Sequence, residues 1–326
     1  MDHALALARR GLGNTWPNPA VGCVLVRDGR VVGRGWTQPG GRPHAEVRAL
    51  AQAGEAARGA TAYVTLEPCA HHGKTPPCAE ALIRSGVTRV VTALTDPDPR
   101  VSGRGHAMLR AAGIAVTEGV RESAAREAQR GFLTRVTLGR PMLTLKLATS
   151  FDGRIATALG ESQWITAPAA RRHVHALRLT HDAVMVGGGT ARADRPGLNV
   201  RGMGRVRQPV RVVVSSGPLP DLPPEGAEHG PLWQLADDPA AVMADLGARG
   251  LTRVLCEGGG ILAAGLLRAG LVDQLVGYTA GVVLGGDGRA ATGPLALARL
   301  ADAPRFRLVE TRPIGPDLMH RWLRAE

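Results

Sequence analysis

Aromatic residues are scarce in this chain of 326 residues, where Trp, Tyr and Phe together make up 3% of the sequence. Proteins that bind single-stranded nucleic acid stack bases on aromatic side chains, so such a surface would be hard to build here. The net charge is +12, yet no run of Lys or Arg forms a basic tail, and the positive residues are scattered among acidic ones. An Arg-rich soluble surface accounts for most of this charge, and it would also favour phosphorylated substrates.

Long apolar runs and a disulfide framework are also missing. No uninterrupted apolar stretch reaches about 18 residues, so we expect no membrane span. The first residues, Met1-Asp2-His3, lack the charged and apolar regions of a signal peptide, which predicts a cytoplasmic protein. Four cysteines are too few for a disulfide framework in a chain of this length. Cys23 and Cys256 lie in apolar, strand-like runs, and we expect both to be buried thiols.

The other two cysteines belong to a metal-binding pattern. His44 and Glu46 stand in Pro-His-Ala-Glu, and Cys69 follows Glu-Pro, with Cys78 nine positions later. One imidazole and two thiolates make three ligands of a tetrahedral Zn²⁺ and leave the fourth position for water. His-x-Glu followed by Pro-Cys…Cys is typical of zinc deaminases of nucleobases. Two alternatives stay open: a buried His with two structural thiols, and a Glu46 that only orients a ligand.

The reaction that this pattern predicts is a hydrolytic deamination. Zinc can lower the pKa of a bound water to about 7, which gives hydroxide at neutral pH. The hydroxide would attack the ring carbon that bears the amino group. Glu46 would take the water proton, give it to the ring nitrogen, and later protonate the departing amine.

The spacing of the cysteines narrows the substrate. Eight residues separate Cys69 from Cys78, whereas deaminases of free cytosine, deoxycytidylate or tRNA usually carry Cys-x-x-Cys. The intervening Ala-His-His-Gly-Lys-Thr-Pro-Pro closely resembles the deaminase domain of the bifunctional riboflavin-biosynthesis deaminase–reductases. So do Asn-Pro-Ala-Val-Gly at residues 18–22 and Asp-Pro-Asp-Pro at residues 96–99. The resemblance extends over nearly the whole chain.

This resemblance assigns substrate contacts in the first domain. It implies that Asn18 contacts the pyrimidine or the ribose, and that Lys74 meets the phosphate of the substrate. Without the resemblance, Lys74 would be read as an ordinary solvated lysine. Some relatives carry a His where this chain has Thr37, which cannot carry charge. We therefore expect the contacts on that side of the substrate to differ.

The length of the chain predicts two domains, and the sequence breaks at Thr-Leu-Gly-Arg-Pro, residues 137–141. Strands and helices alternate on both sides of the break, which predicts α/β folds. The resemblance implies a cytidine-deaminase-like three-layer domain, the zinc-dependent pyrimidine deaminase, at residues 1–140. A dihydrofolate-reductase-like α/β domain, the NADPH-dependent reductase, would follow at residues 141–326.

Local signals place some elements more closely. Asp28-Gly29 predicts a hairpin between strands 20–27 and 30–35. Helices are expected to begin at His44 and at Cys78, so the ligands would lie at helix N-termini, where the helix dipole favours a thiolate.

Four segments of the second domain look functional, at residues 145–154, 161–166, 186–201 and 256–265. In the last of them a strand runs into Gly258-Gly259-Gly260 and then a helix. Such a turn presents backbone N–H groups and a positive helix end to a phosphate. Its G-x-G-x-x-A spacing is weak evidence, since a Rossmann domain would place it in the first βαβ unit.

The family resemblance implies NADPH as the cofactor and the following contacts. The cofactor would be held by Ala148, Trp164, Thr190, Asp194, Ser216 and residues 259–265, which are Gly259, Gly260, Ile261, Leu262, Ala263, Ala264 and Gly265. The phosphoribosyl substrate would be held by Lys146, Ser162, Arg178, Leu198, Arg201 and Glu257.

Simpler interpretations exist for some of these residues. Arg178 and Arg201 suit a phosphate because a guanidinium binds it bidentately, but each arginine alone would more often face solvent. Asp194 could instead cap the turn before Pro196.

The resemblance implies an enzyme of two consecutive steps. The first is deamination of 2,5-diamino-6-(5-phosphoribosylamino)pyrimidin-4-one, and the second is reduction of 5-amino-6-(5-phosphoribosylamino)uracil by hydride transfer to C1′ of the ring-opened ribose. The expected partners are phosphorylated pyrimidine ribotides and further copies of this chain in a dimer or tetramer, without nucleic acid or membrane. Two rival hypotheses are a deaminase with a silent second domain and an editor of tRNA or single-stranded DNA.

Overall fold

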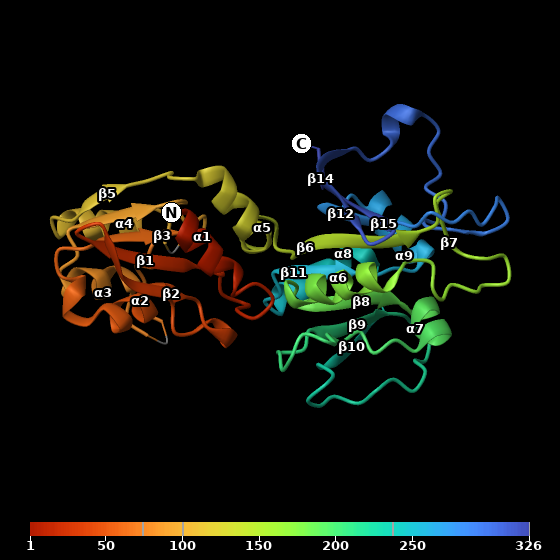
Figure 1. The fold of residues 1–326 in the computed structure, drawn as a ribbon, viewed down its shortest axis with the longest axis horizontal. Coiled ribbons are helices and arrows are strands. Elements are labelled where there is room, and N and C mark those ends of the chain that lie inside the picture. The colour runs from red at the N-terminus through yellow and green to blue at the C-terminus, as the bar shows by residue number, and fades with distance from the viewer. Residues whose placement is uncertain (74, 100, 237, 326) are drawn as a thin grey trace. The chain divides into compact units, whose positions relative to one another are not determined.

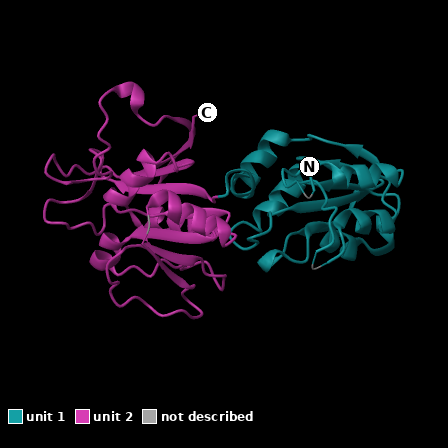
Figure 2. Ribbon diagram, turned by 180° about the vertical axis from the view of Figure 1, so that it is seen from behind, with its two compact units in different colours: residues 1–139 teal, residues 140–326 magenta. Residues whose placement is uncertain are grey.

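The structure is a computed structural model that describes residues 1–73, 75–99, 101–236 and 238–325. The chain divides into two compact units, Met1–Gly139 and Arg140–Glu326, which Figure 2 shows in teal and magenta. Each unit consists of a mixed β-sheet with helices packed on it (Figure 1). No helix in the described part of the chain is long and apolar enough to span a bilayer.

The first unit contains a five-stranded sheet in the order β2-β1-β3-β4-β5. β1 is antiparallel to both β2 and β3, whereas β3, β4 and β5 run parallel. The strands are β1 (Gly22–Arg27), β2 (Arg30–Trp36), β3 (Thr61–Val64), β4 (Arg89–Thr92) and β5 (Ala115–Thr117). The hairpin predicted at Asp28-Gly29 is confirmed, and both turn residues have positive φ angles, 50° and 72°.

Five α-helices belong to this unit: α1 (Asp2–Arg9), α2 (Ala45–Ala53), α3 (Cys78–Ser85), α4 (Arg104–Ala111) and α5 (Glu122–Leu138). Short 3₁₀ turns lie at Pro39–Gly41 and Gly54–Ala57. The expected helix starts are confirmed, because His44 is the residue before α2 and Cys78 is the first residue of α3. Aliphatic side chains fill the core, among them Leu25, Val64, Leu82, Val90 and Leu109.

Two glycines of β2 allow α2 to lie directly on the sheet. A Cβ atom at Gly35 would lie 2.1 Å from the carbonyl oxygen of Ala45, and one at Gly33 would lie 2.3 Å from that of Ala49. Neither position has room for a methyl group, since the obstacle is helix backbone. The contact therefore fixes how closely the helix that follows His44 approaches the sheet.

We predict that Gly35→Ala destabilises the first unit by about 3 kcal/mol, because overpacking against backbone forces the helix outward. The shift of α2 would also lower the zinc content of the purified protein. Thermal unfolding and metal analysis would measure the two effects. Gly286→Ala is the control, since a Cβ there meets nothing within 4 Å and both readouts should be unchanged. An unaltered zinc content in a destabilised Gly35→Ala would contradict the proposed coupling.

The second unit contains an eight-stranded sheet in the order β10-β9-β8-β11-β6-β12-β15-β14. The six strands from β10 to β12 are parallel, and β15 and β14 continue the sheet as an antiparallel hairpin. The bounds are β6 (Met142–Thr149), β8 (Ala183–Gly187), β9 (Val210–Val214), β10 (Leu232–Leu235), β11 (Arg253–Cys256), β12 (Gln274–Thr279), β14 (Phe306–Ile314) and β15 (Asp317–Arg324).

Four α-helices accompany these strands: α6 (Pro168–Leu179), α7 (Gly188–Asp194), α8 (Pro239–Ala248) and α9 (Gly260–Arg268). A small separate sheet pairs β7 (Arg154–Ala156) with β13 (Arg289–Ala290), and a 3₁₀ turn lies at Leu300–Asp302. Cys23 and Cys256 are fully buried in β1 and β11, as expected.

The sequence did not predict the terminal hairpin of β14 and β15. β14 reads FRLVETRPI, contains Pro313 near its end, and has no buried residue along its length. Such a strand lacks the apolar alternation of a half-buried strand, and charged residues with a proline are typical of a sheet edge. The hairpin forms because β15 pairs with the parallel strand β12.

A buried histidine joins α6 to the sheet of the second unit. His181 is 1% exposed, and its Nδ1 lies 2.8 Å from the carbonyl oxygen of Leu177 and its Nε2 lies 2.9 Å from Thr144 Oγ1. Burial, and then the nearby Arg253, lower the pKa of His181 to about 3. The folded protein thus holds this ring neutral at pH values where the unfolded chain protonates it.

This histidine should make the second unit lose stability in mild acid. Because its pKa is about 3 when folded and about 6.5 when unfolded, stability present above pH 6.5 is lost as the pH falls toward 3. The loss between pH 7 and 5 should be about 2 kcal/mol. Urea unfolding at several pH values would measure it, with His181→Gln as the comparison. A variant with the same pH slope as the parent would contradict the prediction.

Candidate active sites

The predicted zinc ligands converge in the first unit. His44 Nδ1 lies 3.3 Å from Cys78 Sγ and 3.7 Å from Cys69 Sγ, and the three ligand atoms all lie within 4.8 Å of one another. A tetrahedral Zn²⁺ with Zn–N and Zn–S bonds of roughly 2.0 and 2.3 Å would separate such atoms by roughly 3.5 Å. The donor set and its spacing therefore fit zinc.

Cys78, the first residue of α3, stabilises the thiolate form of Cys69. The backbone N–H of Cys78 donates to Cys69 Sγ at 3.2 Å. The thiol of Cys78 also donates to this sulfur, and together with His44 these hydrogen bonds outweigh burial and lower the pKa of Cys69 to about 4. Since the thiolate is the form that binds metal, Cys69 is a ligand without having to lose a proton at neutral pH.

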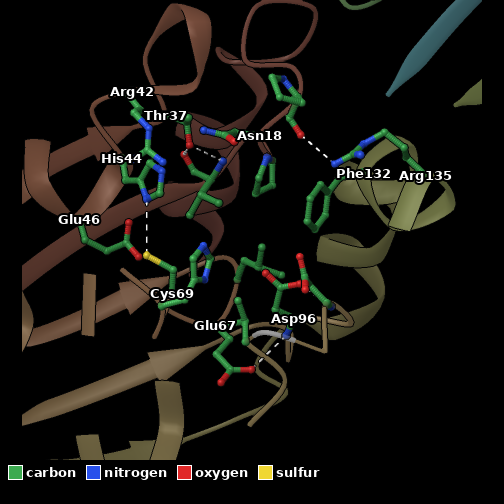
Figure 3. Close-up of a pocket in the computed structure, with 17 residues that line it drawn as sticks. Asn18, Thr37, Arg42, His44, Glu46, Glu67, Cys69, Asp96, Phe132 and Arg135 are labelled. Carbon is green, nitrogen blue, oxygen red and sulfur yellow. Dashed lines mark hydrogen bonds between the residues drawn. The ribbon is translucent and has the colours of Figure 1, made fainter. Parts of the chain in front are cut away.

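Glu46 lies beside these ligands in the first turn of α2 (Figure 3). It is 4% exposed, and burial raises the pKa of its carboxyl while the nearby His44 opposes the rise. A buried carboxyl with a raised pKa exchanges protons more readily near neutral pH than an exposed one. The arrangement can therefore carry protons to and from a group bound next to the metal ligands.

Asn18 and Thr37 line the same cavity, and the side chain of each also makes a hydrogen bond to the backbone. Asn18 Nδ2 donates to the carbonyl oxygen of Gly41 at 2.8 Å, which holds the segment before His44. Thr37 Oγ1 accepts from the backbone N–H of Val21 at 3.0 Å, so this side of the cavity carries no charge at position 37. Lys74, expected at the substrate phosphate, lies outside the described residues.

Glu67 organises the opposite side of the cavity. Its buried carboxylate accepts four backbone hydrogen bonds of 2.9–3.3 Å, from the N–H groups of Asp96, Gly103, Gly105 and His106. Four donors on one carboxylate hold the loop before α4 firmly, since hydrogen bonds to charged groups are the stronger class.

This bonding connects the loop to the metal site, because Glu67 stands two residues before the ligand Cys69. The loop brings Asp96 and Asp98 to the cavity wall. Burial raises the pKa of Asp96 to about 6. The sequence showed the motif around Asp96 but gave no reason to assign it a place at the site.

The second cavity gathers many of the residues expected at the reductase site. Its lining includes Lys146, Ala148, Ser162, Trp164, Arg178, Thr190, Asp194, Leu198, Arg201 and Glu257. Ser216 and residues 259–265 are not part of this lining. The glycine loop lies close by, since a Cβ at Gly259 would be 3.1 Å from Thr190 Oγ1.

A buried ion pair lies at the base of this cavity. The Arg178 guanidinium donates from Nε to Glu257 Oε1 at 2.5 Å and from Nη2 to Oε2 at 2.8 Å, and both side chains are about a tenth exposed. Lys146 is half-buried, and the loss of solvent around its amine lowers its pKa although Glu257 opposes the shift. Burial would raise the pKa of Glu257, but Arg178 and then Lys146 hold it below its usual value.

This pair uses one edge of the Arg178 guanidinium, and Nη1 donates to the carbonyl oxygen of Asn199 at 2.5 Å. Arg201 lines the same cavity and is exposed. The two arginines and Glu257 were expected at this site from the family resemblance, but the pairing of Arg178 with Glu257, which joins α6 to the residue after β11, was not predicted.

Other lining residues were not expected from the sequence. Arg171 lies with its guanidinium carbon 4.5 Å from the centre of the exposed Trp164 ring, and Tyr278 of β12 lines the cavity wall. In the first cavity the unexpected residues include Arg42 and His71. His71 and Arg42 stand beside the metal motifs in sequence, whereas Tyr278 reads as an ordinary core residue of its strand.

Comparison with known families agrees with the two units. The cytidine and deoxycytidylate deaminase zinc-binding region matches residues 1–94, and the RibD C-terminal domain matches residues 141–320. The expected fold class, a cytidine-deaminase-like domain followed by an α/β reductase domain, is confirmed.

Similar proteins match along their whole length. The riboflavin biosynthesis protein RibD of Escherichia coli (strain K12) is 44% identical, over 98% of this chain and 96% of that protein. The solved structure of Acinetobacter baumannii RibD, form 1, has a TM-score of 0.88 and 38% identity, with 100% of this chain and 98% of that chain covered. A Thermotoga maritima deaminase/reductase structure has a TM-score of 0.87 and 35% identity, with 100% and 97% covered.

The metal ligands and the two matched families define a zinc-dependent deaminase joined to a reductase in one chain. The chain belongs to the RibD family, and it is a bifunctional enzyme of riboflavin biosynthesis with a hydrolase and an oxidoreductase domain.

We predict that Glu67→Gln loosens the loop before α4 and leaves the zinc ligands in place. An amide replaces one acceptor oxygen with a donor that faces backbone N–H groups, which should cost about 1–3 kcal/mol. Hydrogen exchange at Gly103 and Gly105 should accelerate while zinc content is retained. Glu80→Gln is the control, since this partly exposed carboxylate lies on α3 and, among the described residues, pairs with Arg84 and His72. Unchanged exchange at the two glycines would refute this role.

Proposed function

We propose that the first unit deaminates 2,5-diamino-6-(5-phosphoribosylamino)pyrimidin-4-one and that the second reduces 5-amino-6-(5-phosphoribosylamino)uracil with NADPH. The observation that carries the first assignment is the convergence of His44, Cys69 and Cys78 next to the buried Glu46. The Thermotoga maritima relative is described as a deaminase and reductase acting on these phosphoribosylamino compounds. The domains would be residues 1–140 and 141–326.

In the deaminase, His44, Cys69 and Cys78 would hold Zn²⁺, which when bound acidifies water and so supplies the nucleophile. Glu46 takes one proton of the attacking water and gives it to the ring nitrogen, and it then takes the proton of the added hydroxyl and gives it to the departing amine, which leaves as ammonia. The amide of Asn18, fixed by Gly41, orients the pyrimidine or ribose at the cavity wall. Lys74 remains the proposed phosphate contact.

In the reductase, NADPH when bound supplies the hydride that reduces C1′ of the ring-opened ribose. The protein has to align the two reactants and exclude water. The proposed substrate side of the cavity is lined by Lys146, Ser162, Arg178, Leu198, Arg201 and Glu257, and Arg178 also holds Glu257 in its ionised form.

The proposed cofactor side of the same site is made of residues from several segments. Those within the cavity lining are Ala148, Trp164, Thr190 and Asp194. Gly258 and Gly259 have φ angles of 123° and 93°, which leave backbone N–H groups at the start of α9 available to a phosphate. Ser216 and residues 259–265 would complete the cofactor contacts from beside the cavity.

We also propose a cytoplasmic enzyme that assembles into a dimer or tetramer. Both follow from the family resemblance, and sedimentation of the purified protein would determine the assembly.

A coupled assay tests the two activities together. Zinc-loaded protein is given the diaminopyrimidine ribotide and NADPH, and ammonia release and absorbance at 340 nm are followed at the same time. We expect Glu46→Gln to slow ammonia release by about 10²–10⁴-fold, because the proton carrier is lost. NADPH oxidation with the preformed uracil ribotide should be unaffected.

Asp194→Asn serves as the reciprocal variant, and it should impair NADPH oxidation only. Ammonia release without NADPH oxidation in the parent protein would favour a deaminase with a silent second domain. Loss of both signals in Glu46→Gln, with the uracil ribotide supplied, would contradict the separation of the two sites.

A further inference from the structure

Arg42 is a positively charged residue on the wall of the deaminase cavity. It is neither a metal ligand nor the proposed proton carrier. It stands two residues before His44 and lines the cavity together with Asn18 and Thr37. Its Nη1 donates to Thr75 Oγ1 at 2.5 Å, so its side chain extends from the start of α2 toward the loop between the two cysteines. Figure 3 shows the guanidinium above His44.

Within the described residues, Arg42 makes no ion pair with a carboxylate. Most arginines of this unit near an acid do make one, as Arg84 does with Glu80 and Arg110 with Glu118. Among the described residues, its hydrogen-bond partner is the neutral hydroxyl of Thr75, which uses one of the five N–H donors of a guanidinium. The charge and most of the donors are therefore available to a ligand.

The cavity is electrostatically polarised. Asp96 lies on the opposite side from Arg42, and Glu67 accepts a hydrogen bond from its backbone N–H (Figure 3). An anionic group on a bound molecule is repelled from the aspartate side and attracted to the arginine side. Thr37, which lines the same cavity, has no ionisable group and contributes no charge, and its hydroxyl accepts a hydrogen bond from the backbone N–H of Val21.

We infer that Arg42 binds the phosphate of the ribotide substrate and makes the deaminase selective for phosphorylated over unphosphorylated pyrimidine nucleosides. This inference rests on the proposed function of the first unit. A guanidinium suits the task because it presents paired N–H donors to phosphate oxygens and stays charged at every working pH.

Deamination of two matched substrates tests the inference. Ammonia release by the zinc-loaded full chain is measured with the diaminopyrimidine ribotide and with its phosphatase-treated counterpart. Arg42→Gln should raise KM for the ribotide about tenfold or more, with kcat nearly unchanged, because the lost contact is made equally in the ground and transition states. KM for the unphosphorylated substrate should not change. Arg42→Lys should recover part of the preference, since it keeps the charge without the fork.

Three further variants separate phosphate binding from other effects. Thr75→Val removes the hydrogen bond to the loop and should keep the preference for the ribotide. Arg48→Gln removes an arginine of α2 that is not part of the cavity lining, and it should behave as the parent. Arg135→Gln removes the other arginine of the wall, whose Nη2 donates to the carbonyl oxygen of Pro17.

Three outcomes would overturn the inference: an equal KM rise for both substrates in Arg42→Gln, no rise for either, or a preference that disappears in Arg135→Gln and persists in Arg42→Gln. The first would make Arg42 a residue that only holds the loop. Failure of the parent protein to release ammonia from either substrate would instead refute the proposed function. Calorimetric titration with ribose 5-phosphate then decides on Arg42 separately, since Arg42→Gln should bind one molecule fewer per chain than the parent.

Discussion

The deaminase site depends on the close contact between α2 and β2. Gly33 and Gly35 let the helix backbone lie on the strand with no side chain between them, and the residue before this helix is His44. Since Glu46 is in the first turn of the same helix, one packing distance sets the position of a metal ligand and of the proton carrier. A site of this kind tolerates little movement, because a displaced proton carrier no longer reaches the reacting atoms.

Helix α3 carries another metal ligand, and its first residue also helps to set the geometry of the site. Cys78 opens α3, so its N–H has no partner within the helix and is free to bond Cys69 Sγ. The helix end thus supplies both a ligand and a donor that stabilises the neighbouring thiolate. Glu67 then extends this order to the loop before α4, through four backbone N–H groups that would otherwise need other partners.

The local parts of this site could be predicted from the sequence. Ligand identity, the helix starts at His44 and Cys78, and the hairpin at Asp28-Gly29 each follow from a few adjacent residues. What could not be predicted depends on contacts between distant segments. Glu67 bonds to residues 29 to 39 positions later, and no local pattern reports which carboxylate will receive those N–H groups.

Sequence patterns are limited in the same way in the second unit. They predicted the strongly apolar strands and helices but not the polar ones, which depend on contacts with distant segments. β14 has the composition of a surface segment and becomes a strand only because β15 pairs with it. The pairing of Arg178 with Glu257 could not be predicted either, because it joins α6 to a residue that follows β11, 79 positions later.

The charged side chains are arranged differently in the two cavities, although both cavities are proposed to bind a phosphoribosyl compound. In the reductase cavity the charges of Arg178 and Glu257 compensate one another, so the cost of burying this pair is offset within the protein before any ligand binds. The pair holds the Glu257 carboxylate ionised and in a fixed place. In the deaminase cavity Arg42 makes no ion pair with a carboxylate of the described residues, and it lies on the opposite side from Asp96. Such a wall can orient a charged ligand as it enters. Fixed orientation suits a hydride transfer that needs alignment of two bound molecules, whereas a polarised wall suits a site that must select one phosphorylated ring from a pool of similar bases.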